Sequence, residues 1–160
     1  MKNTAAQLSA FIKNAYLGKN WVEVDFKNVL EDITLEEANT RFVPLNSIAG
    51  IVYHLDYYVS IVLGRLKGEL LPSNANNGFD IQHAGSPEDW EELLIRFYRN
   101  VELFAAYVKD FDDQRLQEDF LDNKYGNNIY NIQGIVEHAY YHLGQIVLLK
   151  KMIRSKNFTK

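Results

Sequence analysis

The sequence predicts an all-α protein: an up-and-down-type four-helix bundle with short extra helices between the first and second long helices. Three observations favour this fold class. Four long segments carry apolar residues at helical spacing, capping residues precede several of them, and no segment has a convincing strand pattern. Amphipathic helices of this kind bury their apolar faces against one another, which produces a bundle around one core.

The first long helix is expected over residues 3–17, where the apolar side chains form one stripe. A short helix should begin after Asp25, which is a suitable capping residue. Another short helix is expected near residues 35–40, because Thr34 and Glu37 match a capping box, in which each side chain binds the backbone N–H of the other residue.

Three more long helices complete the predicted bundle. The second, at about residues 47–67, is apolar around much of its circumference and should therefore be central. The third begins at Ser86 and Pro87, a capping serine followed by proline at the first helical position, and runs to about Lys109. The last helix is expected at about residues 129–154.

Three connections separate these helices. Residues 20–24 should be extended, and the strand-like alternation there is discounted because a single strand would have no partner. Residues 69–85 are rich in Asn, Gly and Pro and form a long loop, and such loops often serve as lids or rims of sites. Residues 110–128 are polar and turn-rich.

Length and composition restrict the class of protein. The chain of 160 residues is most simply one domain, residues 1–160, with residues 155–160 as a frayed tail, and it can bury a core without a structural metal. The absence of cysteine excludes disulfides, thiol nucleophiles and Cys-type metal sites, so metal ligands must be His or carboxylates. No signal peptide or bilayer-spanning run is present, so we expect a cytoplasmic protein without a membrane partner.

The net charge of -4 argues against a nucleic-acid partner, because such surfaces need a basic patch. Basic residues cluster only at the end of the chain, where they should complement the dipole of the last helix and continue into a solvated tail. These residues are Lys150, Lys151, Arg154, Lys156 and Lys160.

The strongest candidate site is a set of three histidines. His138 and His142 are four residues apart in the last helix, which places both imidazoles on one face. His54 has a similar context, since residues 48–57 and 132–141 both read I-x-G-I-V-x-H-x-x-Y. Three neutral imidazoles can bind Zn, Ni, Fe or Mn and leave positions open for water or substrate. The alternative is that each histidine is a satisfied core residue.

Several neighbours could complete the site. The side chains of four residues could form hydrogen bonds to the histidines or line a substrate cavity: Tyr57, Tyr58, Tyr141 and Gln145. Most of the tyrosines must nevertheless be packing residues. Gly50 and Gly134 each precede a histidine by four residues, either for close helix approach or for room above the imidazoles. His83 could cover the site as part of a lid, but an exposed loop histidine is the simpler interpretation. Glu137 should point away from His138, which makes it a weak general base.

Two motifs resemble the DinB/YfiT-like superfamily of small bacterial four-helix bundles. They are N-S-I-x-x-I-V-x-H-L at residues 46–55 and H-x-x-Y-H-L-G-Q-I at residues 138–146. The resemblance implies that His54, His138 and His142 are ligands of a divalent metal and that the protein is a homodimer. It also implies, from characterised branches, the use of a low-molecular-weight thiol such as bacillithiol or mycothiol.

Two functions remain open at this point. The first is a metal-dependent enzyme, of hydrolase or thiol S-transferase type, acting on a small-molecule substrate through an open three-histidine site. The second is a non-catalytic bundle that binds or senses a metal or small ligand. A DNA-binding role has little physical support in an acidic chain.

Overall fold

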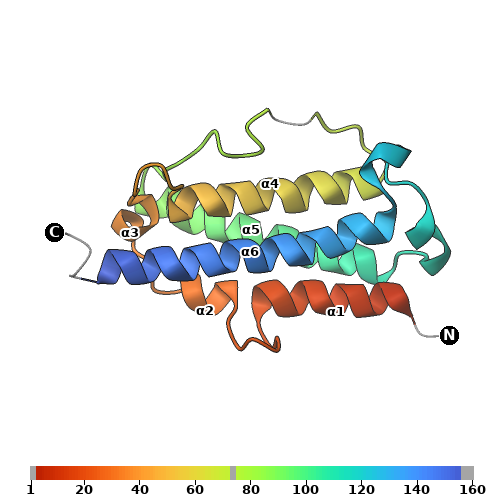
Figure 1. Cartoon of the computed structure of the whole chain (residues 1–160), viewed down its shortest axis with the longest axis horizontal. Coiled ribbons are helices and arrows are strands. Elements are labelled where there is room, and N and C mark those ends of the chain that lie inside the picture. The colour runs from red at the N-terminus through yellow and green to blue at the C-terminus, as the bar shows by residue number, and fades with distance from the viewer. Residues whose placement is uncertain (1–2, 73–74, 156–160) are drawn as a thin grey trace.

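The computed structural model describes residues 3–72 and 75–155, and in this part of the chain the regular structure is helical. The long helices are α1 (Thr4–Leu17), α4 (Ile48–Leu66), α5 (Pro87–Lys109) and α6 (Asn128–Arg154), and the short ones are α2 (Phe26–Leu30) and α3 (Leu35–Asn39). Two 3-10 turns, η1 (Asp113–Gln117) and η2 (Asn123–Tyr125), lie between α5 and α6. The predicted all-α four-helix bundle is confirmed (Figure 1). Of the expected tail, residues 156–160 lie outside the described residues.

Local capping interactions explain where the helices begin. The side chain of Ser47 accepts a hydrogen bond from the backbone N–H of Gly50, and that of Ser86 accepts one from Asp89. The predicted capping box of Thr34 and Glu37 is present at the start of α3. Each cap satisfies an N–H group that has no partner within its own helix. The helix starts are therefore set by local sequence.

The long connection between α4 and α5 allows α5 to run parallel to α4. Asp56 of α4 accepts a hydrogen bond from Arg96 of α5. Further along both helices, the Leu66 carbonyl of α4 accepts one from the Tyr107 hydroxyl of α5. Because the residue numbers rise together, α4 and α5 run parallel, while α1 and α6 run the opposite way (Figure 1). The bundle therefore contains one crossover connection, and the up-and-down alternation expected from the sequence does not hold between α4 and α5, because the long connection carries the chain back along the bundle before α5 begins.

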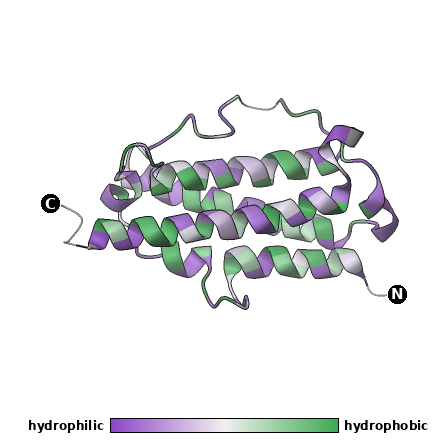
Figure 2. Cartoon of the chain, in the orientation of Figure 1, coloured by the Kyte–Doolittle hydropathy of each residue, from purple (hydrophilic) through white to green (hydrophobic). Residues whose placement is uncertain are grey.

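An aromatic cluster packs α1 and α2 against the rest of the bundle. The rings of Tyr16 and Phe26 stack with centroids 5.2 Å apart, and Phe97 from α5 meets both edge-on. The Tyr16 hydroxyl donates a hydrogen bond of 3.2 Å to the Ile135 carbonyl of α6, and burial raises the pKa of this tyrosine. Each long helix carries both apolar and polar residues (Figure 2), and the buried apolar ones form one core cluster.

The last turns of α6 are held by acidic residues. Lys150 and Arg154 both bind the Asp32 carboxylate, at 2.5 and 2.8 Å, and Arg154 also binds Glu37 at 2.6 Å. These contacts lower the pKa values of Asp32 and Glu37 to about 2. Lys150 and Arg154, expected to complement the dipole at the end of the last helix, thus also connect α6 to α3 and to α2, where Lys150 donates a hydrogen bond to the Val29 carbonyl. Lys156 and Lys160 lie outside the described residues.

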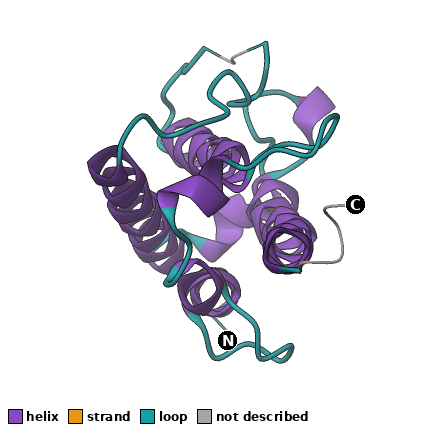
Figure 3. Cartoon of the chain, turned by 90° about the vertical axis from the view of Figure 1, so that its left-hand side faces the viewer, coloured by secondary structure: helices purple, strands orange, loops and turns teal. Residues whose placement is uncertain are grey.

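The connection between α4 and α5 crosses one side of the bundle, and the loop between α1 and α2 projects from the opposite side (Figures 1 and 3). Residues 20–25 form no strand, and Trp21 is 96% exposed there. Within the described residues, no helix is both long enough and apolar enough to cross a bilayer.

Candidate metal centre

Three histidines converge between the middle of α4 and the middle of α6. One nitrogen from each of His54, His138 and His142 lies within 4.8 Å of the others, and the Nε2 atoms of His54 and His138 are 2.8 Å apart. His54 and His142 are buried and His138 is half-buried. The four-residue spacing on α6 and the antiparallel packing of α4 against α6 produce this convergence, so the predicted cluster is present in the structure.

Hydrogen bonds to two of the rings determine which nitrogen faces the centre. The Nδ1 atom of His54 lies 2.6 Å from the Asn77 carbonyl, which can only accept, so His54 must donate through Nδ1. The Nδ1 atom of His142 lies 2.7 Å from Oε1 of Gln145 and donates in the same way. In a neutral ring this leaves Nε2 with a lone pair. Nδ1 of His138 is buried and has no hydrogen-bond partner among the described residues.

Burial keeps these imidazoles neutral. It lowers the pKa of His54, and together with a smaller effect of the neighbouring imidazoles it lowers the pKa of His138 to about 3 and that of His142 to about 4. A neutral imidazole is the form that coordinates a metal. Buried lone pairs that face one another with no carboxylate among them fit a divalent cation, which would satisfy all of them at once.

Aromatic rings enclose the cluster. The Phe79 ring stacks on His54 with centroids 3.9 Å apart. Tyr58, one turn after His54 on α4, places its ring edge-on to both His54 and His138, at 4.9 and 4.8 Å. Rings at these positions exclude water from the imidazole faces, which strengthens electrostatic interactions in the centre.

The loop before α5 fits closely against α4. Gly78 has φ +82°, and a Cβ atom there would lie 2.7 Å from Cβ of Tyr57 and 3.2 Å from Cα of His54. A Cβ on Gly50 would lie 2.7 Å from Oε1 of Gln82. Glycine at both positions therefore allows the loop to approach the helix. The close approach expected at Gly50 is thus to a loop and not to another helix.

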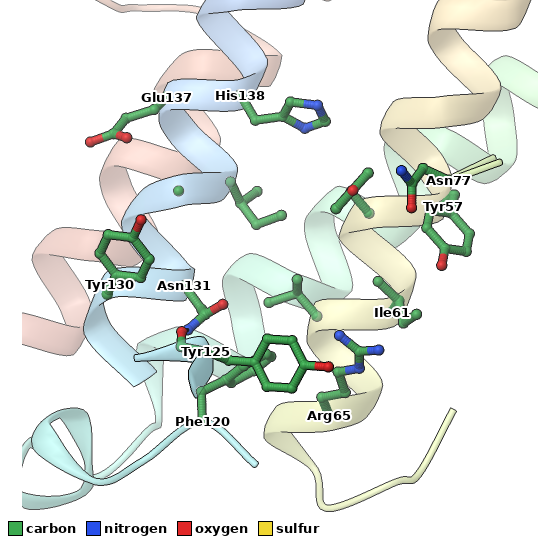
Figure 4. A pocket seen from close by; sticks show the side chains of 14 residues that line it. Tyr57, Ile61, Arg65, Asn77, Phe120, Tyr125, Tyr130, Asn131, Glu137 and His138 are labelled. Carbon is green, nitrogen blue, oxygen red and sulfur yellow. The ribbon is translucent and has the colours of Figure 1, made fainter. Parts of the chain in front are cut away.

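The other predicted residues lie at different distances from the centre. The Tyr141 ring is exposed and edge-on to His142 at 4.9 Å, whereas Tyr57 is half-buried. His83 is exposed and outside the described histidine cluster. The Glu137 carboxylate points away from the His138 ring (Figure 4), as the helical spacing predicted.

A cavity of about 470 Å³ adjoins the centre and shares His138 and Tyr58 with it. Gly134 lines it, and a Cβ there would meet nothing within 4 Å, so no close helix approach requires a glycine at this position. Figure 4 shows the lining side chains. They come from α4, from α6 and from both long connections: Tyr57, Tyr58, Ile61, Val62, Arg65, Asn77, Phe120, Tyr125, Tyr130, Asn131, Gly134, Ile135, Glu137 and His138.

Four of the contributing residues carried no individual signal in the sequence. Asn77 and Phe79 come from the loop before α5, and Phe120 and Tyr125 come from the connection before α6. The sequence indicates only that residues 69–85 form a loop that could rim a site and that residues 110–128 are polar and turn-rich. A backbone carbonyl such as that of Asn77 has no signature in residue type, so it could not be found from the sequence.

Comparisons with known proteins agree with this fold. A family model described as the DinB superfamily matches residues 20–146. Among solved structures, a conserved protein from Enterococcus faecalis superposes with a TM-score of 0.66, covering 94% of this chain and 95% of its own at 15% sequence identity. At that identity the likeness shows the fold alone. No curated protein matches the chain.

Proposed function

The chain belongs to the DinB superfamily, and on this basis we propose that it binds a divalent metal ion through His54, His138 and His142 and acts as a metal-dependent enzyme on a small molecule. One observation carries the proposal: three imidazoles with nitrogens within 4.8 Å of one another lie beside a cavity of about 470 Å³. Cavities of this size suit small-molecule ligands.

A divalent ion held by three histidines supplies Lewis acidity and keeps a coordinated water or thiol ionised at neutral pH. Zn, Ni, Fe and Mn all fit imidazole ligands. A low-molecular-weight thiol is the cosubstrate that the superfamily resemblance favours, with hydrolysis as the other class of reaction.

The chain's own residues would orient and protect the reacting groups. Asn77 and Gln145 hold two of the imidazoles in the tautomer that presents Nε2. Phe79 covers one face of His54. Tyr58 lines the cavity beside two histidines, and its hydroxyl is protonated at neutral pH and can donate a hydrogen bond to a bound substrate; burial raises its pKa further above neutral.

Metal content tests the first part of the proposal. Purified wild-type protein should contain a stoichiometric divalent metal by elemental analysis, and His138→Ala should lose most of it. His83→Ala is the matched control, because this exposed histidine lies outside the described cluster and its removal should leave the metal content unchanged. Only trace metal in the wild type, or equal metal in His138→Ala, would contradict the proposal.

Turnover tests the second part. A screen of thiols against electrophilic small molecules and ester substrates should reveal a reaction that a chelator abolishes and the re-added metal restores. Tyr58→Phe should retain metal and lower the rate. If metal-loaded protein binds ligands but turns over none of them, the non-catalytic binding or sensing function replaces the enzyme.

A further inference from the structure

Arg65 occupies the part of the cavity wall farthest along α4 from the histidines. It follows His54 by eleven residues, which is three turns, so both side chains project from the same face of the helix. The distance along the helix axis is roughly 16 Å. Side chains on a helix lean toward its N-terminus, so the guanidinium is brought back toward the histidines. Figure 4 shows Arg65 beside Tyr125, with His138 in the opposite part of the cavity.

The Arg65 guanidinium has no carboxylate partner in the described part of the chain. It is half-buried and lies over the Tyr125 ring, with its central carbon 5.8 Å from the ring centroid. Arg96 and Arg154, by contrast, each bind an acidic side chain. Arg65 lies in the last turn of α4 and so complements the helix dipole. That role does not require a position in a cavity wall.

The other side chains that line the cavity indicate the chemical character of the ligand that would fit it. Ile61, Val62, Phe120 and Ile135 contribute apolar side chains to the lining, and Asn131 and Tyr125 contribute polar ones. Arg65 and Glu137 also line the cavity, and the Glu137 carboxylate lies at the His138 end, away from Arg65 (Figure 4). A single guanidinium matches one negative charge, and its planar fork matches a carboxylate. A phosphate dianion would need more positive charge than this end of the cavity offers.

We propose that the cavity binds an elongated carboxylic acid, with its carboxylate on Arg65, an apolar middle section, and its reactive end at the histidine cluster. This inference rests on the proposed metal site and specifies the substrate class for it. Arg65 is thereby a specificity-determining residue, and the polar end of α4 selects acidic over neutral molecules of the same shape.

The test uses full-length protein loaded with Co(II), whose absorption reports a coordinated thiolate. The probes are 8-mercaptooctanoate and its neutral amide, and 3-mercaptopropionate with its amide as a pair too short to reach Arg65. Wild-type protein should bind the long acid about tenfold more tightly than the long amide, as a charge-assisted hydrogen bond predicts. The short pair should show no such preference.

Two variants locate the preference. Arg65→Gln should bind the long acid and the long amide equally, with amide affinity and metal content unchanged. Arg99→Gln is the matched control, because it removes the same charge from an exposed position on α5 outside the cavity lining and should keep the preference.

The possible failures are distinguishable. Protein that takes up no metal would contradict the proposed function itself. Metal-loaded protein that binds the long acid and amide alike, binds neither, or keeps its preference in Arg65→Gln would overturn the assignment of Arg65 while leaving the metal site intact.

Discussion

At the scale of single residues, Asn77 and Gln145 perform the same task by different means. Each accepts a hydrogen bond from Nδ1 of one histidine and so leaves Nε2 available to a metal. Gln145 belongs to the same helix as His142, so its position is fixed by helical geometry. Asn77 belongs to a loop, so its carbonyl meets His54 only while the loop stays against α4.

Gly78 is the residue on which that loop position depends. Gly78→Ala should push residues 77–79 away from His54, because the new Cβ would lie 2.7 Å from Cβ of Tyr57. Loss of the Asn77 hydrogen bond should weaken metal binding by about 10- to 100-fold, measured by competition with a chromophoric chelator. Gly68→Ala is the control, since Gly68 has a similar φ of +85° and open space around it. Equal metal affinities in the two variants would contradict the role of the loop.

The sequence predicted the centre of the site better than its surroundings. His138, His142 and Gln145 share one helix, so their spacing alone places them together. His54 was found through a repeated local context. Phe79 could not be found in this way, because its contact with His54 depends on how a long loop folds back, and loop conformation is not encoded by periodicity.

At the scale of elements, the parallel pair α4 and α5 is joined by a buried carboxylate. Asp56 is 6% exposed and binds Arg96 and Asn100, both at 2.7 Å. Asp56 and His54 project from different faces of α4, so one helix packs on α5 through this network and presents the histidine toward α6. The network thereby holds α4 in the orientation that the candidate centre requires.

Removal of Arg96 should destabilise the protein, because Asp56 would stay buried without its charged partner. Arg96→Ala should lower the free energy of unfolding by about 2 kcal/mol, because a buried carboxylate loses its charged partner. Adding Asp56→Asn should restore about 1 kcal/mol, since a neutral amide needs no counter-charge. Urea unfolding of metal-free protein measures both values. A double variant no more stable than Arg96→Ala would contradict this account.

The end of α6 is predicted to depend on Arg154 in a pH-dependent way. Arg154→Ala should lower the midpoint of thermal unfolding and speed amide exchange in the last turns of α6, whereas Lys151→Ala, an exposed neighbour, should change neither. The pKa values of Asp32 and Glu37 are lowered to about 2. Their stabilising contribution is therefore complete above about pH 4, the unfolded-state value, and is lost as the pH falls through about 2.

Thermal unfolding between pH 6 and pH 2 checks the sign of this pH dependence. The difference in midpoint between wild type and Arg154→Ala should be largest near neutral pH and should shrink as the carboxylates of the wild type protonate. A difference that stays constant or grows toward low pH would show that Arg154 acts through packing and not through charge.

The positions of the helices could be predicted from the sequence more easily than the directions in which the helices run. Caps such as Ser47, Ser86 and Thr34 act within a few residues, so the helix starts follow from local sequence. The parallel course of α4 and α5 depends on contacts between residues far apart in the chain, such as that of Arg96 with Asp56. Periodicity carries no information on such contacts.

At the scale of the whole molecule, the core does not need the metal. The apolar cluster extends from Ala5 on α1 to Leu149 on α6, and the histidines occupy only a small part of the α4–α6 interface. A chain of this length can bury enough apolar surface to fold without a metal.

Metal removal should therefore leave a folded protein of lower stability. After chelation, circular dichroism should still show a helical spectrum and a single cooperative thermal transition. Because an ion that binds only the folded state stabilises it by mass action, free metal at 100 times the Kd should add about 2.7 kcal/mol and raise the midpoint by roughly 5–10 °C. His138→Ala should show little of this shift, and His83→Ala should show all of it. Unfolding on chelation would mean instead that the ion is structural, and an unshifted midpoint in the wild type would mean that the three imidazoles do not hold an ion.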